Sequence, residues 1–81
     1  MEEKVLDARG LKCPMPIVKS KKALQELLAG QVLKVIATDP GSVLDFQGWA
    51  KTNPSFQLVG QRNEKDETGR DLYVHLLARN G

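Results

Sequence analysis

The spacing of apolar positions changes along the first part of the chain, and each spacing predicts a different element. A short apolar run predicts a strand over Lys4–Ala8. Apolar residues at helical spacing then predict a helix that follows Pro16, reaches about Ala29 and is ended by Gly30. The positions that define this helix are Ile17, Leu24, Leu27 and Leu28.

The middle of the chain repeats this succession of strand and helix. A nearly continuous apolar run over Gln31–Thr38 predicts a strand in the interior of a sheet. Ser42 with Asp45 three residues later approximates a capping box, which predicts the start of a second helix that ends near Asn53. The residues of this helix that are expected to face the core are Val43, Phe46, Trp49 and Ala50.

Two further strands are expected in the last third of the chain, because apolar and polar residues alternate over Ser55–Arg62 and Asp71–Arg79. The charged segment Asn63–Arg70 between them predicts a long hairpin loop. His75, the only histidine, is expected to be a surface or half-buried strand residue and is not paired with the cysteine described below.

The predicted order is therefore βαβαββ, which is typical of an α/β (α+β) two-layer sandwich. Strands joined by a helix should be parallel with a right-handed crossover, whereas the last two should form an antiparallel hairpin. We expect a mixed four-stranded sheet with both helices on one face, in a single domain that spans residues 1–81.

The composition limits the classes of function. A single cysteine excludes an internal disulfide and a cysteine-based zinc cluster, and no metal or organic cofactor is expected. A secreted chain of 81 residues usually has paired cysteines, which favours a reducing cytoplasm. Residues 1–10 lack the apolar core of a signal peptide, and no apolar run approaches the ~18 residues of a membrane span.

Positive charge is concentrated around this cysteine, although the net charge of the whole chain is only +2. Positions 9 to 22 hold five basic residues and no acidic residue, so the remaining positions carry a net −3. The basic residues are Arg9, Lys12, Lys19, Lys21 and Lys22. The sequence leaves two interpretations open: a solvated basic surface, or a docking surface for an acidic partner.

The cysteine itself lies where the first helix is expected to begin. Pro14 suits the first helical position and favours the extended backbone of an N-cap residue at Cys13. Pro16 removes another amide hydrogen, which leaves the Met15 amide available to a capping sulfur. With the helix dipole and the nearby cations, this arrangement predicts a lowered pKa for the Cys13 thiol. The alternative is a buried, unreactive cysteine.

The residues around the cysteine also carry a resemblance. Residues 6–16 read LDARGLKCPMP, which resembles the signature of the TusA/SirA-like family of small sulfur carrier proteins, whose mark is Cys-Pro-x-Pro. The similarity continues through Gly30–Leu33 and Ala37–Ser42 and thus covers most of the chain. Asp7 belongs to this block, although a turn residue at the end of a strand explains it equally well.

The resemblance implies a fold like that of the C-terminal domain of bacterial translation initiation factor three, and a persulfide on Cys13. It implies that a cysteine desulfurase or a rhodanese supplies the sulfur, and that a protein of the DsrE type commonly accepts it. Known outlets include tRNA thiolation, molybdenum-cofactor supply and dissimilatory sulfur oxidation. Such a protein is a sulfurtransferase-type carrier rather than a turnover enzyme. The supporting residues would be Arg9, Lys12, Pro14, Pro16, Lys19 and Lys22.

Two other functions compete with this interpretation. A small RNA-binding or regulatory module would use the basic face between Arg9 and Lys22, but the chain has four aromatic residues and no recognisable RNA-binding motif. No direct contact with nucleic acid is therefore expected. A thiol peroxidase or redox sensor would use a resolving cysteine or a base close to Cys13, and the sequence places neither there.

Overall fold

The computed structural model describes residues 3–12 and 15–80 of the chain. Six elements follow one another in the order that the sequence predicts. They are β1 (Glu3–Ala8), α1 (Met15–Gln25), β2 (Val32–Ala37), α2 (Ser42–Thr52), β3 (Phe56–Lys65) and β4 (Asp71–Arg79).

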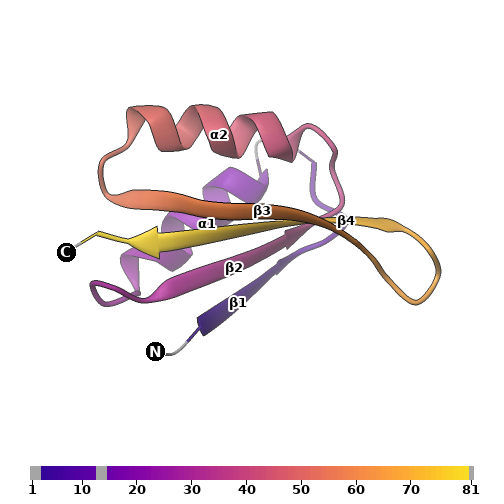
Figure 1. The fold of residues 1–81 in the computed structure, drawn as a ribbon, viewed down its shortest axis with the longest axis horizontal. Coiled ribbons are helices and arrows are strands. Elements are labelled where there is room, and N and C mark those ends of the chain that lie inside the picture. The colour runs from indigo at the N-terminus through magenta and orange to yellow at the C-terminus, as the bar shows by residue number, and fades with distance from the viewer. Residues whose placement is uncertain (1–2, 13–14, 81) are drawn as a thin grey trace.

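The four strands form one sheet in the order β1-β2-β4-β3. β1 and β2 are parallel, whereas β4 is antiparallel to both of its neighbours. Both helices lie on the same side of this sheet (Figure 1), so the two-layer sandwich with a mixed sheet is confirmed. The β3–β4 hairpin projects beyond the end of the sheet toward which the carboxyl ends of β1 and β2 point (Figure 1).

The core lies between the helices and the sheet. Leu33 and Val35 are fully buried on alternate positions of β2, so one face of this interior strand packs beneath the helices. The prediction that Phe46 and Trp49 belong to the core is confirmed, because Phe46 is fully buried and Trp49 packs edge-on against its ring at 5.8 Å.

The first helix is shorter than the sequence predicts. It ends at Gln25 instead of continuing to about Ala29, and Gly30, with φ of +85°, lies in the turn that leads into β2. The cause lies at the other end of the chain, where the Arg79 guanidinium donates hydrogen bonds of 2.7 Å to two backbone carbonyls. The first carbonyl belongs to Leu24 in the last turn of α1, and the second belongs to Leu27 just beyond the helix.

Replacement of Arg79 by methionine is expected to lower the free energy of unfolding by about 2 kcal/mol. The variant loses two charge-assisted hydrogen bonds and a cation at the negative end of the helix dipole, while the aliphatic part of the side chain is kept. Denaturant unfolding followed by circular dichroism measures the change. Arg62→Met is the matched control, because Arg62 forms only an exposed ion pair with Glu64 and should change stability by less than about 0.5 kcal/mol. Equal effects of the two substitutions would contradict this role of Arg79.

The predicted capping box at the start of the second helix is wrong. Gly41 is the N-cap residue of α2, and a glycine has no side chain that could cap the helix. Ser42 is the first residue of the helix and is buried, so its hydroxyl points into the protein and cannot return to the amides of its own helix. The partner of this hydroxyl is His75 on β4.

The hairpin loop is also shorter than predicted, because β3 continues to Lys65. The Asp66 carboxylate closes the turn by accepting hydrogen bonds from the amides of Thr68 at 2.8 Å and Arg70 at 2.9 Å. The Thr68 hydroxyl, which donates to the same carboxylate at 2.6 Å, and then the Arg70 amide lower the pKa of Asp66. Gly69 supplies the positive φ of +85° that the turn requires. The backbone of Arg70, the residue directly before β4, is therefore held in place by this turn.

Candidate functional site

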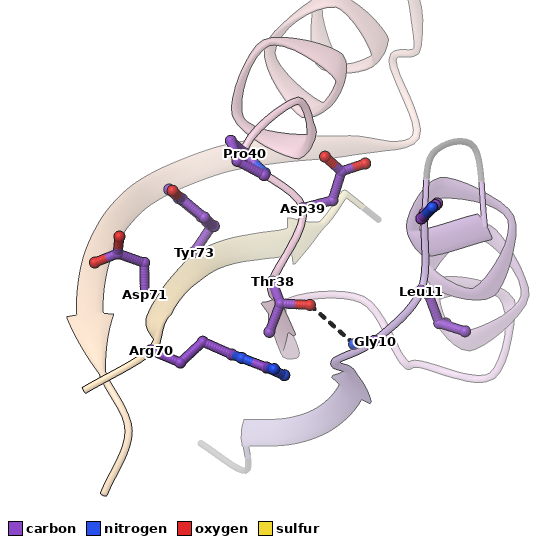
Figure 2. Close-up of a pocket in the computed structure, with 9 residues that line it drawn as sticks. Gly10, Leu11, Thr38, Asp39, Pro40, Arg70, Asp71 and Tyr73 are labelled. Carbon is purple, nitrogen blue, oxygen red and sulfur yellow. Dashed lines mark hydrogen bonds between the residues drawn. The ribbon is translucent and has the colours of Figure 1, made fainter. Parts of the chain in front are cut away.

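The loop between β1 and α1 is held from two sides. The Asp7 carboxylate accepts three hydrogen bonds from Arg9, one from its amide at 3.0 Å and two from its guanidinium at 2.9 Å. These bonds lower the pKa of Asp7 to about 2. From the end of β2, the Thr38 hydroxyl accepts a hydrogen bond of 2.9 Å from the Gly10 amide (Figure 2). The loop between β1 and α1 is thus anchored as far as Gly10, five residues before α1 begins at Met15.

Cys13 and Pro14 lie outside the described residues. The predicted N-cap geometry of Cys13 and the placement of Pro14 at the first helical position therefore remain predictions. The described neighbours on either side are Lys12, which is exposed, and Met15, whose side chain is 41% exposed. In the sequence, Cys13 therefore stands between two described residues, Lys12 and Met15, that are both exposed to solvent.

One detail of the predicted cap is wrong. The Met15 amide donates a hydrogen bond of 2.9 Å to the Lys12 carbonyl, so it is already engaged and is not available to a capping sulfur. Pro16 is buried, and its carbonyl accepts a hydrogen bond of 2.7 Å from the buried Ser20 hydroxyl one turn later. The first turn of α1 is therefore closed by local backbone and side-chain hydrogen bonds.

The exposed face of α1 combines an apolar end with a basic body. Met15 and Val18 expose 41% and 51% of their surface, and Lys19 and Lys22 follow on the same face at helical spacing. Among the described residues, the four ion pairs do not include Lys12, Lys19 or Lys22. Arg9 differs from these lysines because its charge is matched by Asp7 at 2.9 Å. Within the basic segment 9–22, the cations outside the ion pairs of the described residues are therefore the lysines.

His75 is a correction to the sequence analysis, because it is fully buried instead of exposed or half-buried. Its ring stacks on Phe46 with 4.3 Å between centroids. The Gln61 amide donates to Nδ1 at 3.1 Å, so Nδ1 is the acceptor, and the protonated Nε2 donates to the Ser42 hydroxyl at 2.9 Å. Burial lowers the pKa of His75 to about 4, and the ring is neutral at pH 7. This histidine joins α2 to the sheet.

An open cleft of about 610 Å³ lies at the carboxyl ends of the two parallel strands (Figure 2). Three segments that are distant in the sequence line it: the loop after β1, the loop after β2, and the end of the hairpin with the start of β4. The lining residues are Gly10, Leu11, Lys12, Thr38, Asp39, Pro40, Arg70, Asp71 and Tyr73. Lys12, the residue before Cys13, thus shares a cleft with residues nearly sixty positions away.

Sequence reasoning missed three residues of this region, and for two of them there was no signal to find. Arg70 was assigned to a loop and Tyr73 to a strand, and only the register of the hairpin brings them to the cleft. Thr38 stands within the family-like block 37–42, which could have marked it, but its bond to Gly10 depends on the parallel pairing of β1 with β2.

Within residues 3–12 and 15–80, no three or more His, Asp or Glu side chains are grouped so that they could hold a metal ion. Neither helix of this described part is long and apolar enough to cross a membrane.

The amino-acid sequence is similar to a protein family and to several known proteins. The model of the family "Sulfurtransferase TusA" matches residues 4–72. A putative sulfur carrier protein of Halobacterium salinarum is 43% identical over 74 residues, which cover 91% of this chain and 85% of that protein. The sulfur carrier protein TusA of Allochromatium vinosum is 63% identical over 46 residues, which cover 57% of this chain and 60% of that protein.

A solved structure agrees with the fold. The crystal structure of a SirA-like protein from Desulfitobacterium hafniense matches with a TM-score of 0.67 and 29% sequence identity. The match covers 98% of this chain and all of that chain. The expected fold class is therefore found in a relative as well as in this protein.

Proposed function

We propose, from the premise that this chain belongs to the TusA family and is a sulfur carrier protein, that Cys13 holds the carried sulfur as a persulfide. One observation carries the proposal: Cys13 is the only cysteine of the chain, so no other side chain can form a persulfide. Its place in the CPMP motif of the family-like block supports the same assignment. With no second cysteine in the chain, the persulfide also cannot discharge into an internal disulfide.

The chemistry of the proposed carrier is a pair of thiol exchange steps. In loading, the Cys13 thiolate attacks the outer sulfur of a donor persulfide, the donor S–S bond breaks, and the donor cysteine leaves as a thiolate. In unloading, an acceptor thiolate attacks the outer sulfur on Cys13, and Cys13 leaves as a thiolate. Both steps use the thiolate, which the neighbouring cations Lys12 and Lys19 favour.

As a sulfur carrier, the protein interacts with proteins that supply and accept sulfur. We assign their docking to the exposed face of α1, where Met15 and Val18 offer apolar contact. Lys19 and Lys22, which are outside the ion pairs of the described residues, offer positive charge there. A partner with an acidic rim around its reactive cysteine fits this face. Arg9 is engaged by Asp7, so its role is to anchor the loop before Lys12.

For the donor we propose a cysteine desulfurase or a rhodanese-type sulfurtransferase, and for the acceptor a protein of the DsrE type, as the family relationship suggests. The outlet is tRNA thiolation or dissimilatory sulfur oxidation. We propose the cytoplasm as the compartment, because a single persulfide-bearing thiol is best preserved where disulfides do not form readily.

Mass spectrometry of the loaded protein tests the proposal. Incubation with a sulfane-sulfur donor should add the mass of one sulfur atom, about 32 Da, and peptide mapping should place it on residue 13. Because two added oxygen atoms also weigh about 32 Da, oxidation of the two methionines or of the thiol would mimic this result. Dithiothreitol separates the cases, since it removes persulfide sulfur and leaves these oxidations in place. An adduct that resists dithiothreitol, or that maps elsewhere, would refute the assignment.

A further inference from the structure

We propose that the cleft at the carboxyl ends of β1 and β2 binds the carboxylate of a low-molecular-weight thiol persulfide, so that Cys13 can be loaded without a protein donor. The inference rests on the proposed function of Cys13. To that function it adds a binding site, in which Arg70 and Lys12 are the cationic residues. It also adds a second class of sulfur donor, the small-molecule persulfides.

The charges of the cleft point to an anionic ligand. Lys12 and Arg70 both line it, and neither takes part in an ion pair among the described residues. Of the two acidic residues of the lining, Asp71 is balanced by Lys65 in an ion pair of 3.1 Å, whereas Asp39 keeps its charge and accepts a hydrogen bond of 3.0 Å from the Gly41 amide. With Lys65, which balances Asp71, the charged side chains of the cleft carry a net charge of +1, and the nearby Asp66 carboxylate also interacts electrostatically with Arg70.

Arg70 is well placed to recognise a carboxylate. Its amide is held by Asp66 at 2.9 Å, so the side chain starts from a fixed backbone position. In Figure 2 the side chain extends along the cleft from the hairpin toward Gly10 and Thr38. A guanidinium can donate two parallel hydrogen bonds to a carboxylate, which fixes the orientation of a small ligand as well as its charge.

The place and size of the cleft favour a small molecule over a protein segment. Ligands of open sheets that contain parallel strands gather beyond the carboxyl ends of those strands, which is where this cleft lies. Its volume of about 610 Å³ is in the range of sites that enclose small ligands. The exposed face of α1, where we place the protein partners, shares no residue with the lining of this cleft. The cleft is thus available to a ligand of amino-acid or short-peptide size.

The loading step is balanced without a further reactant. The Cys13 thiolate attacks the outer sulfur of the small persulfide, the S–S bond of the persulfide breaks, and the small thiol leaves as its thiolate. One sulfur atom and its proton move to Cys13, and no oxidant or reductant is used. The carboxylate takes no part in bond making, so its contribution is to hold the donor in the cleft.

The experiment compares two donors that differ by one charge. N-acetylcysteine persulfide carries a carboxylate, and the persulfide of N-acetylcysteine methyl ester does not. We expect the wild-type protein to be loaded about tenfold faster by the acid, and we expect Arg70→Gln to lose this preference while its rate with the ester is unchanged. Arg62→Gln is the matched control, because Arg62 lies on β3 outside the cleft, and it should keep the preference.

A binding measurement supports the kinetic one. S-methyl-N-acetylcysteine cannot transfer sulfur, and in the wild-type protein it should shift the backbone amide resonances of Thr38 and Tyr73 saturably, with a weaker effect in Arg70→Gln. Equal loading by the two donors, or equal losses in Arg70→Gln and Arg62→Gln, would overturn the cleft proposal. So would loading by a protein donor when neither small persulfide reacts, and in that case the carrier function would stand. If no donor of any kind loaded Cys13, the proposed function itself would fail.

Discussion

Replacement of Cys13 by serine is expected to abolish both loading and relay of sulfur, with a loss of at least about a thousandfold in the rate of each step. The serine hydroxyl is not ionised near neutral pH, and it does not form the sulfur–sulfur bond on which the carrier depends. No other residue can compensate, because the chain holds one cysteine only. The measurement is transfer of radiolabelled sulfane sulfur from a donor, through this protein, to an acceptor thiol.

The control for this substitution is the stability of the variant. Serine and cysteine have nearly the same size, and both neighbours in the described chain, Lys12 and Met15, are exposed. We therefore expect Cys13→Ser to unfold within about 0.5 kcal/mol of the wild-type protein. A variant that was folded and still relayed sulfur would show that the carrier atom is not at position 13. A large loss of stability would instead favour the buried, structural cysteine that the sequence left open as the alternative.

Acidification is expected to remove about 2 to 3 kcal/mol of stability between pH 6.5 and pH 4 through His75 alone. The pKa of His75 is lowered from 6.5 to about 4 in the folded protein, because its ring is buried. In this interval the unfolded chain binds a proton that the folded protein does not bind. The stabilisation is therefore complete above pH 6.5, decreases as the pH falls toward 4, and changes little further below that value.

Urea unfolding at a series of pH values measures this slope. His75→Gln removes the titrating group, so the free energy of unfolding of this variant should be nearly constant between pH 6.5 and 4, whatever its value at pH 7. The lowered pKa values of Asp7 and Asp66 act in a different window, since these carboxylates lose their stabilising effect only below their ordinary value of 3.8. A wild-type slope that persisted in His75→Gln would assign the acid sensitivity to other groups.

The buried histidine also shows where sequence reasoning reached its limit. A histidine in an alternating strand pattern is compatible with either face of the sheet, and position 75 was expected at or near the surface. The register of β4 against β2 places it opposite Val35, on the face covered by the helices. Its two polar contacts then come from α2 and β3, at Ser42 and Gln61, which are 33 and 14 residues away. No local pattern contains that information.

The ends of the helices were mispredicted for a related reason. Gly30 and the pair Ser42 and Asp45 are ordinary local signals for a helix stop and a helix start, yet α1 ends at Gln25 and the Ser42 hydroxyl binds His75. In both places a side chain from β4, Arg79 or His75, supplies the decisive hydrogen bond. Tertiary partners outweigh local signals here because each provides a charged or buried hydrogen bond, which exceeds the contribution of a typical exposed cap.

The chain alone determined the succession of strands and helices, because the periodic burial of apolar side chains follows from neighbouring residues, and it determined that the single cysteine stands within a basic segment. The tertiary structure decided what surrounds that segment. Pairing of β1 with β2 brought the Thr38 hydroxyl to the Gly10 amide, and the β3–β4 hairpin brought Arg70 and Tyr73 to the cleft beside Lys12. Contacts between residues thirty to sixty positions apart depend on strand register, and register is fixed only when the whole sheet buries one of its faces.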